Sequence, residues 1–314
     1  MNLKELFKRK PKATEEQPQT AEEQLLSAEE QPQAEPVDTK KKRKATRIIY
    51  FTLFGIFSAI FIFSAIYMMD YFIVSSRESK KYNALSDNKS QIQDILTNTP
   101  TDPDGSLIYD PETEYPFDTE SEILPEYQAA YAANNDLAGW ISIEGTVIDY
   151  PVMYRPADKD YYLHRNFYGE YEKRGPGAIF IREKCDPFKP SDNVVIYGHY
   201  KQDGSMFHDL HGYYRQSFWQ EHQFIRYDTI YERHTYQIVA VFKTNVDSDD
   251  FFPYHKFNDA KNEEEFNDFI NTVKRMSFYD TGVDAEFGDK LITLSTCEYT
   301  LSNGRLVVVA KQIS

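Results

Sequence analysis

The positions of apolar residues divide the chain into one long uninterrupted run and a later series of short runs. Residues 48–69 form the long run, IIYFTLFGIFSAIFIFSAIYMM, which contains no charged residue and is followed by Asp70. At about 1.5 Å per helical residue, this run can cross a hydrocarbon core about 30 Å thick. We therefore predict one transmembrane helix, with the anchor covering residues 48–74.

The segment between the anchor and the first β-type run contains weaker helical signals. Residues 75–98 are polar, with apolar positions at loosely helical spacing, and predict a helix between membrane and domain. Residues 99–118 contain four prolines and a glycine, which favour an extended linker. Residues 119–134 predict a second short helix. We therefore divide this part into a helix and linker, 75–118, and a folded domain, 119–314.

From Trp140 onward, short runs rich in Tyr, Val, Ile, Phe and Thr alternate with turns, as expected of strands. These runs are 140–153, 177–181, 193–198, 224–244, 290–297 and 305–313. Six to eight strands separated by Gly, Asp and Asn turns predict a mostly β fold, a closed or nearly closed barrel. We expect one helix to interrupt the strands, at 262–276, with Asn262 as its N-cap.

Charge indicates how the chain is oriented in the membrane. The basic run Lys40–Arg47 lies directly before the apolar run, so the positive-inside rule places residues 1–47 in the cytoplasm and 75–314 outside. A cleaved signal peptide is the alternative, but the run is long and no small-x-small site follows Met69. The net charge of −15 argues against nucleic acid as a partner, because a phosphate-binding surface needs a basic stripe.

The composition of the N-terminal region predicts that it does not fold. Residues 1–39 are rich in Glu, Gln and Pro and nearly free of aromatic residues. Such a segment cannot bury enough apolar surface to offset the entropy of ordering. We expect residues 1–47 to be a disordered cytoplasmic tail that ends in the basic juxtamembrane run. That run could be a nuclear signal or a nucleic-acid patch, but its position against the span disfavours both.

The chain has only two cysteines, Cys185 and Cys297. A disulfide between them is possible, whereas a free cysteine in an oxidising compartment invites a chemical explanation. Cys297 ends a strand-like run, in which alternation places it on one face with Thr293 and Ser295. Its position alone fits either a buried inert residue or a reactive thiol at a barrel rim.

A nucleophilic cysteine needs a basic or cationic neighbour, and two residues qualify. His199 follows an apolar strand through Gly198, which allows close approach of backbone or substrate. Arg305 lies just beyond a short loop closed by Asn303-Gly304, so a hairpin would bring it to the end of the barrel that carries Cys297. There its charge could favour the thiolate or hold an oxyanion. A structural histidine and a solvent-exposed arginine are the alternatives.

Metal chemistry has little support in the sequence. His208 and His211 have i, i+3 spacing, but the chain contains no HExxH motif and no paired CxxC motif. A phosphate-binding glycine loop is also missing. We therefore predict neither a metal site nor a cofactor.

Three short strings together resemble a sortase. Thr293–Cys297, TLSTC, is similar to the TLxTC signature of that family, and the strings YGH and NGR, which end at His199 and Arg305, are similar to the segments holding its histidine and arginine. The order His, Cys, Arg also fits, whereas papain-like proteases place Cys before His. The resemblance covers about residues 120–314. Cys185 has no counterpart that we recognise, and we expect it to be a spare surface thiol.

Further features resemble class B sortases in particular. They are the serine in TLSTC, the string DGSMF at Asp203–Phe207 and the helix at 262–276 before the cysteine strand. Class C sortases, which polymerise pilins, typically carry a leading lid with an Asp-Pro-aromatic motif and a second membrane span. Here no second apolar run precedes Ser314, and Asp186–Phe188 lies inside the domain.

The resemblance implies an eight-stranded β-barrel with N-terminal helices and a cysteine transpeptidase activity without cofactor. Cys297 would attack the threonine carbonyl in a C-terminal sorting motif, of a type like NPxT, on a secreted protein. His199 would protonate the leaving amine, and Arg305 would hold the carbonyl or its oxyanion. Ser295 and Glu298 flank the nucleophile and are expected to contact substrate.

The same resemblance implies the location and partners of the protein. The catalytic domain, 119–314, would lie outside a Gram-positive cell, attached to the cell membrane by one N-terminal helix. Its partners would be secreted proteins with a sorting motif and an amine of a peptidoglycan precursor or a pilin. Two alternatives stay open. One is a membrane-anchored cysteine hydrolase that releases peptides to water, and the other is a non-enzymatic surface domain in which Cys297 is merely buried.

Overall fold

The computed structural model describes residues 39–111, 113–171, 175–298 and 303–314. The chain divides into two units, one ending at Ser64 and the other covering Ala65–Ser314. The predicted disordered tail falls largely on residues 1–38, which lie outside the described residues.

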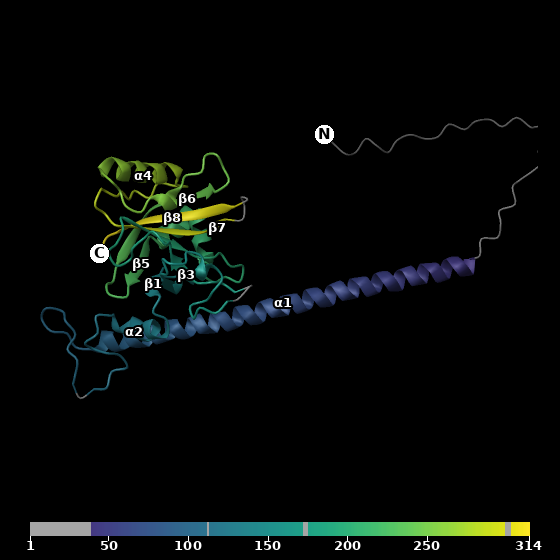
Figure 1. The fold of residues 1–314 in the computed structure, drawn as a ribbon, viewed down its shortest axis with the longest axis horizontal. Coiled ribbons are helices and arrows are strands. Elements are labelled where there is room, and N and C mark those ends of the chain that lie inside the picture. Colours follow the sequence, from purple (N-terminus) through teal and green to yellow (C-terminus); the bar gives the residue numbers. More distant parts are fainter. Residues whose placement is uncertain (1–38, 112, 172–174, 299–302) are drawn as a thin grey trace, which may run out of the picture. The chain divides into compact units, whose positions relative to one another are not determined.

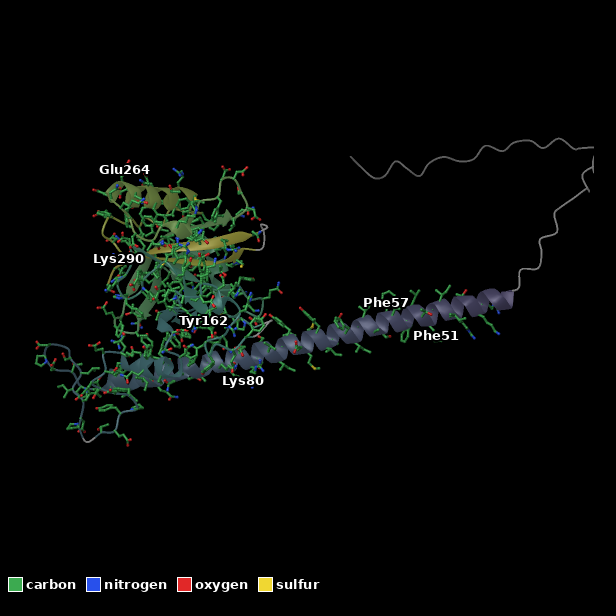
Figure 2. The ribbon with its side chains drawn as sticks, in the orientation of Figure 1. Phe51, Phe57, Lys80, Tyr162, Glu264 and Lys290 are labelled. Carbon is green, nitrogen blue, oxygen red and sulfur yellow. The ribbon has the colours of Figure 1, made fainter. Side chains whose placement is uncertain are left out.

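The apolar run lies in α1 (Thr39–Asn98), one continuous helix. From Thr46 onward, α1 is long and apolar enough to be a candidate membrane span. Phe51 and Phe57 are exposed along this stretch (Figure 2). The helix predicted separately at 75–98 is the continuation of the same helix, because no proline or glycine interrupts the chain after the apolar run.

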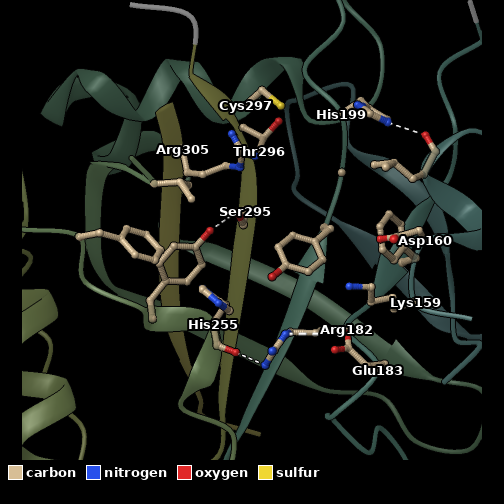
Figure 3. Close-up of a pocket in the computed structure, with 17 residues that line it drawn as sticks. Lys159, Asp160, Arg182, Glu183, His199, His255, Ser295, Thr296, Cys297 and Arg305 are labelled. Atoms are coloured by element: carbon tan, nitrogen blue, oxygen red, sulfur yellow. Dashed lines mark hydrogen bonds and ion pairs between the residues drawn. The ribbon is translucent and has the colours of Figure 1, made fainter. Parts of the chain in front are cut away.

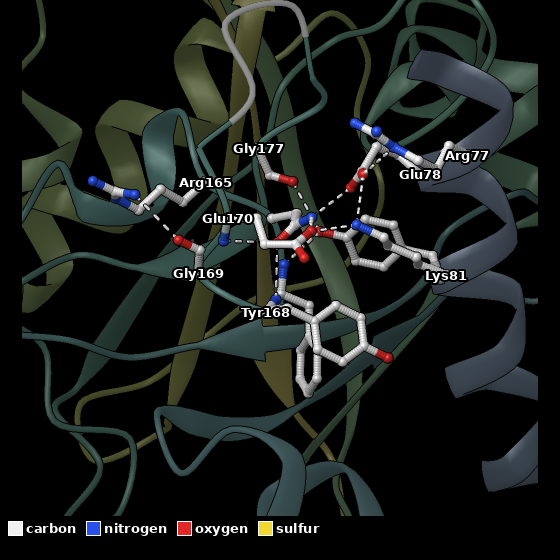
Figure 4. Close-up of polar contacts among 11 residues, drawn as sticks. Arg77, Glu78, Lys81, Arg165, Tyr168, Gly169, Glu170 and Gly177 are labelled. Atoms are coloured by element: carbon white, nitrogen blue, oxygen red, sulfur yellow. Dashed lines mark hydrogen bonds and ion pairs between the residues drawn. The ribbon is translucent and has the colours of Figure 1, made fainter. Parts of the chain in front are cut away.

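Within the unit Ala65–Ser314, the second half of α1 packs one face against the domain. The buried residues of this face follow helical spacing and are Glu78, Tyr82, Lys89 and Ile92. The Glu78 carboxylate is 1% exposed and accepts hydrogen bonds from Asn166 at 2.8 Å and from Lys81 at 3.0 Å (Figure 4). A buried carboxylate needs such partners, so this stretch of α1 is part of the folded domain.

Eight strands form a closed barrel (Figure 1). They are β1 (Leu137–Ser142), β2 (Asp149–Met153), β3 (Ile179–Ile181), β4 (Asn193–Tyr197), β5 (Phe224–Thr229), β6 (Thr235–Asn245), β7 (Leu291–Glu298) and β8 (Gly304–Gln312). The order around the barrel is β1-β2-β3-β4-β7-β8-β6-β5. The pairs β2–β3 and β4–β7 are parallel, and the other neighbouring pairs are antiparallel. The predicted barrel is therefore confirmed.

Alternation along the strands separates two groups of buried side chains. On β8, Leu306 and Val308 join the larger core, whereas Val307 and Val309 join the smaller one. A strand turns successive side chains to opposite faces, so β8 is covered on both sides. The run of five consecutive buried residues from Leu306 follows from this double burial.

The smaller core lies beneath α4 (Glu263–Met276), which packs against β6 (Figure 1). The side chain of Asn262 accepts a hydrogen bond from the backbone N–H of Glu265 at 2.9 Å, which satisfies one of the free donors of the first turn. The helix predicted at 262–276, with Asn262 as its cap, is confirmed.

The prediction that only one helix interrupts the strands was wrong. A 3₁₀ helix, η2 (His208–Tyr214), and α3 (Gln216–Glu221) lie between β4 and β5. They bury Leu210, Tyr213 and Trp219. Each element is too short for helical periodicity to show in the sequence.

The remaining elements are short. They are α2 (Pro125–Ala133), η1 (Tyr161–Leu163) and η3 (Tyr254–Lys256). The helix predicted at 119–134 is thus confirmed in its second half, where Pro125 begins it. In the predicted linker, Thr101 pairs with Leu107 in an isolated bridge, and Pro103–Gly105 turn between them.

Candidate active site

The ends of β4, β7 and β8 meet at a cavity of about 390 Å³ (Figure 3). The three residues singled out from the sequence, His199, Cys297 and Arg305, all line it. They come from three different strands or strand ends, so the fold rather than the local sequence brings them together.

The parallel pairing of β4 with β7 explains why His199 and Cys297 meet. Tyr197 on β4 is opposite Ser295 on β7, and Gly198 N–H donates to the Ser295 carbonyl at 3.1 Å. Two residues beyond this pair, the chain reaches His199 on one strand and Cys297 on the other. Because parallel strands end at the same edge of a sheet, both side chains lie at one rim. The Cys297 sulfur points toward the His199 side of the cavity (Figure 3).

Gly198 is required by close packing at this point. A Cβ atom there would lie 2.5 Å from Ile179 Cδ1 and 2.5 Å from Phe207 Cδ2. Any other residue would displace one of these side chains. Gly198 was expected to allow another group to come close, and this is confirmed. The groups that come close are the side chains of Ile179 and Phe207.

The ring of His199 is held by a backbone carbonyl. Its Nε2 lies 2.7 Å from the Leu163 carbonyl oxygen, which can only accept, so Nε2 carries a proton. This hydrogen bond points away from Cys297, and the other ring nitrogen lies on the cysteine side (Figure 3). In the neutral imidazole, that nitrogen, Nδ1, is therefore a proton acceptor.

Burial lowers the pKa of His199 below the ordinary value of histidine, because the charged imidazolium loses solvation. The hydrogen bond to Leu163 opposes this change and raises the pKa. The positive charges of Lys201, His164 and Arg305 lower the pKa further. The net effect is a histidine that is mostly neutral at neutral pH.

Cys297 is a free, half-buried thiol at the end of β7. Its backbone carbonyl accepts a hydrogen bond from Nε2 of His211, on η2, at 3.1 Å. His211 also stacks on Tyr200, the residue after His199, with ring centroids 4.1 Å apart. The helical segment missed in the sequence thus contacts both strand ends that carry the site.

Arg305 lies directly across the β7–β8 pair from Cys297, as the hairpin prediction required. In an antiparallel pair, opposite residues have Cβ atoms about 5 Å apart and on the same face. Asn303, in the left-handed conformation with φ of 50°, leads into the turn before Arg305. One guanidinium nitrogen donates to the Gly304 carbonyl at 2.8 Å, which directs the side chain along the rim.

Ser295 shares a face with Cys297 and also lines the cavity. Its side chain is buried, and its hydroxyl lies 2.7 Å from the Tyr254 hydroxyl. For Glu298 the structure describes only the backbone, so the expected contact of its side chain with substrate lies outside the described residues.

The prediction that Cys185 is a surface thiol was wrong. The residue is 1% exposed, beneath β4, where its sulfur accepts from Val195 N–H at 3.3 Å and lies 3.5 Å from the Asn193 carbonyl. Burial raises the pKa of the Cys185 thiol to about 11. Charged residues flank it in the sequence, but the turn after β3 places this one side chain in the interior. Both cysteines are free.

Among the described residues, no group of three or more His, Cys, Asp or Glu side chains is placed to hold a metal ion. His208 and His211, the pair considered for this role, stack instead on Tyr200, with ring centroids 5.0 Å and 4.1 Å from it.

Several cavity residues were not identified from the sequence. Leu163 supplies the acceptor for His199, and Tyr254 pairs with Ser295. Both lie in short 3₁₀ turns, 36 and 41 residues away in sequence from the residues that they contact. No local motif marks them, and only the assembled barrel shows their proximity.

Known proteins resemble this chain in sequence and fold. A family model for the sortase domain matches residues 141–313. Sortase B of Staphylococcus aureus is 32% identical over 196 residues, which cover 62% of this chain and 77% of that protein.

Solved structures of sortase B have the same fold. One, a Staphylococcus aureus sortase B–substrate complex, has a TM-score of 0.62 and 26% identity and covers 76% of this chain and 97% of that chain. Another, sortase B complexed with triglycine, has a TM-score of 0.61 and 26% identity and covers 76% and 98%. The chain therefore belongs to the sortase family of cysteine transpeptidases, and the proteins it resembles are sortases of the B type.

Proposed function

We propose that the protein cleaves a C-terminal sorting motif of secreted surface proteins after its threonine and transfers the acyl group to an amine. The observation that carries this proposal is the geometry of the rim. Cys297 is opposite Arg305 across β7–β8, and His199 ends the parallel neighbour β4, with all three lining one cavity. A thiol, a proton carrier and a fixed cation are the groups that thioester formation requires.

In the first half-reaction, the Cys297 sulfur attacks the threonine carbonyl carbon and forms a tetrahedral oxyanion. The C–N bond then breaks, His199 gives a proton to the leaving amine, and a thioester remains. In the second half-reaction, an amine attacks the thioester carbonyl and His199 takes the amine's proton. The C–S bond breaks, and the products are a new amide and free Cys297.

Arg305 is proposed to hold the substrate carbonyl and its oxyanion. The guanidinium has several N–H donors in a fixed plane, and only one of its nitrogens is used by the Gly304 carbonyl. Ser295 and Glu298 are proposed to contact the substrate on either side of the nucleophile. The Ser295 hydroxyl is hydrogen-bonded to the Tyr254 hydroxyl, so Tyr254 would also take part in the contact between Ser295 and the substrate.

The lowered pKa of His199 limits how much enzyme is in the proton-donating state. An ordinary histidine would be about 10% protonated near pH 7.5, and burial reduces this fraction further. The acyl-forming step thus uses the small fraction of enzyme in which His199 is protonated and Cys297 is a thiolate. Arg305 can stabilise this thiolate at any pH in this range, because its guanidinium stays charged.

The substrate and acceptor classes are proposed from the relatives. One sortase B structure is described as a substrate complex and another as a complex with triglycine, a short peptide with a free amine. We propose a sorting-motif peptide as the acyl donor of this chain and a cell-wall precursor peptide or pilin amine as the acceptor. We also propose that α1 crosses the cell membrane once, with the N-terminus in the cytoplasm and the catalytic domain, 119–314, outside.

The test uses the full chain in detergent micelles and a library of sorting-motif peptides. Mass spectrometry is expected to show an acyl adduct on Cys297 that hydroxylamine removes, and triglycine is expected to give a ligated product. Cys297→Ala is the matched control and should give neither. Peptide release without ligation at any triglycine concentration would replace the proposal with a hydrolase, and the absence of adduct with every peptide would refute it.

A further inference from the structure

The helix α1 contacts the immediate surroundings of His199 through one buried tyrosine. Tyr82 is 4% exposed, its hydroxyl donates to the Gly177 carbonyl at 2.8 Å, and it accepts from Phe167 N–H at 3.2 Å. The Gly177 carbonyl is joined by a dashed line to the group of polar contacts beside α1 (Figure 4). The hydroxyl is thus used both as a donor and as an acceptor, and both bonds reach loop backbone rather than helix.

Gly177 is in turn packed against the catalytic histidine. A Cβ atom on Gly177 would lie 3.0 Å from His199 Cδ2 and 2.9 Å from the Leu163 carbonyl oxygen. Its φ of 66° is also in the left-handed region. The backbone of Gly177 therefore lies close to both the imidazole ring and the carbonyl that fixes the tautomer of the ring, with no room for a side chain between them. A shift of Gly177 would move the groups that hold His199.

The loop that follows His199 is held by the same helix. The loop closes on itself, since Phe207 N–H donates to the His199 carbonyl at 3.0 Å. At its tip, Asp203 accepts a hydrogen bond from Ser75 Oγ at 2.7 Å and lies 3.5 Å from the Tyr71 hydroxyl. Both partners of Asp203 are on α1, about two and three helical turns before Tyr82.

A second contact joins the base of this loop to Tyr82. Met206, which has a left-handed φ of 57°, donates its N–H to the Tyr150 hydroxyl at 3.0 Å. The ring of Tyr150 packs edge to face on Tyr82, with centroids 5.6 Å apart. The tip and the base of the loop are therefore both supported by α1, one directly and one through Tyr150.

We propose that the α1 segment Tyr71–Tyr82, which we call the α1 brace, positions the imidazole of His199, and that Tyr82 is its principal positioning residue. This inference rests on the proposed function of His199 as the proton carrier. The brace acts from two sides. Tyr82 fixes the Gly177 backbone against which the ring packs, and Ser75 with Tyr71 fixes the loop that continues from the ring.

The brace is distinct from the rest of the helix docking. About two turns further along α1, Lys89 binds Asp149 and lies over the Trp140 ring, 4.6 Å from its centroid. Those groups contact β1 and β2 and do not line the cavity of His199. The contact of Tyr82 thus reaches the surroundings of His199, whereas the contacts of Lys89 only attach α1 to the domain.

The decisive variant is Tyr82→Phe in the full chain in detergent micelles. Single-turnover acylation of Cys297 by a sorting-motif peptide is measured against peptide concentration, per thiol titrated with an alkylating reagent. We expect the maximal acylation rate to fall about 10- to 100-fold, because misplacing a proton donor by about 1 Å has effects of that size. The half-saturating peptide concentration should change less than about 2-fold, because Tyr82 does not line the cavity.

A spectroscopic readout separates positioning from general loosening. Nitrogen-15 NMR of the imidazole reports exchange of the His199 Nε2 proton, which the Leu163 carbonyl protects in the wild type. Tyr82→Phe is expected to speed this exchange. Ser75→Ala, which removes only the contact at the loop tip, keeps the buried tyrosine and should lower the maximal rate by a few-fold.

The matched control is Lys89→Met, which weakens the docking of α1 without touching the brace. It is expected to lower the melting temperature but to leave the acylation rate per titrated thiol unchanged. Equal rates for wild type and both brace variants would overturn the inference, as would an equal loss in Lys89→Met. An inactive wild type would instead refute the proposed function, so the two failures are distinguishable.

Discussion

The two cysteines of this chain lie at comparable places in the fold but in opposite surroundings. Cys297 ends β7 and lines an open cavity beside Arg305, whereas Cys185 follows β3 and is enclosed beneath β4. Among the residues that the structure describes, the sulfur of Cys185 bonds to the backbone groups of Asn193 and Val195 and to the Asn258 side chain, and burial raises its pKa to about 11. The difference shows that the neighbouring strands, more than the local sequence, decide which thiol faces a cavity and which is enclosed.

The largest expected effect comes from removing each thiol in turn. Cys297→Ala should lower acyl transfer at least about 10⁴-fold, because it removes the sulfur that forms the proposed thioester. Cys185→Ala should keep the wild-type rate and cost about 1 kcal/mol of stability through lost packing and hydrogen bonding. Ligation assays and thermal melts check both variants, and a loss of ligation in Cys185→Ala would break the contrast.

The next effect concerns the cation beside Cys297. Arg305→Ala should lower the rate of acyl-enzyme formation about 10²- to 10³-fold, since it removes a donor to the oxyanion. Arg305→Lys keeps the charge but lacks the planar set of donors, and should recover only part of the loss. Single-turnover acylation measures both. Full activity in Arg305→Ala would place the oxyanion donor elsewhere.

Alkylation of the native protein sharpens the same comparison. At pH 8, a thiol with a pKa of about 11 is only about 0.1% thiolate, and Cys185 is also shielded from reagent. Iodoacetamide should therefore modify Cys297 at least about 10²-fold faster, and Cys185 should react only after unfolding. Peptide mass spectrometry of each site over time gives the two rates. Comparable rates in the native state would contradict the burial of Cys185.

The smallest effect is a shift in pH dependence. Because burial and nearby cations lower the pKa of His199, the acid limb of acylation should lie below about 6.5, the ordinary histidine value. Lys201→Gln removes one of these cations, so the pKa of His199 should rise and the limb should move upward by a fraction of a pH unit. Lys261→Gln, on an exposed residue before α4, is the control and should leave the limb in place.

The same lowered pKa has a consequence for stability. The unfolded chain binds a proton at the ordinary histidine pKa, whereas folded His199 does so only at lower pH. Between these two values the unfolded state holds more protons, so the stability contributed by neutral His199 is lost as pH falls through that window.

The sequence predicted the barrel and the β7–β8 hairpin because both depend on local signals. Alternating apolar runs mark the strands, and Asn303-Gly304 marks the turn that places Arg305 opposite Cys297. The contact between His199 and Leu163 could not be predicted in this way, since it joins a strand end to a 3₁₀ turn. A contact between segments that are distant in the sequence produces no periodic pattern of apolar residues from which it could be predicted.

The errors have the same origin. Cys185 was expected at the surface because no counterpart in the family was recognised, but the turn after β3 buries it. The 3₁₀ and α-helical segment from His208 was missed because it is short, yet it supplies His211, which binds the Cys297 carbonyl. The segment 75–98 was predicted as a separate helix between membrane and domain, whereas it continues α1 and its buried Tyr82 bonds to the Gly177 carbonyl near His199.

The position of β7 between β4 and β8 links the chemistry to the order of synthesis and folding. β4 is made early, but its partner β7 follows only after β5, β6 and α4. Until β7 inserts, β4 keeps an unpaired edge, the barrel is open, and Cys297, the proposed nucleophile, is apart from His199. Closure through such distant segments is a slow, late step. Cys297 therefore meets His199 only after β7 has been synthesised and has inserted beside β4.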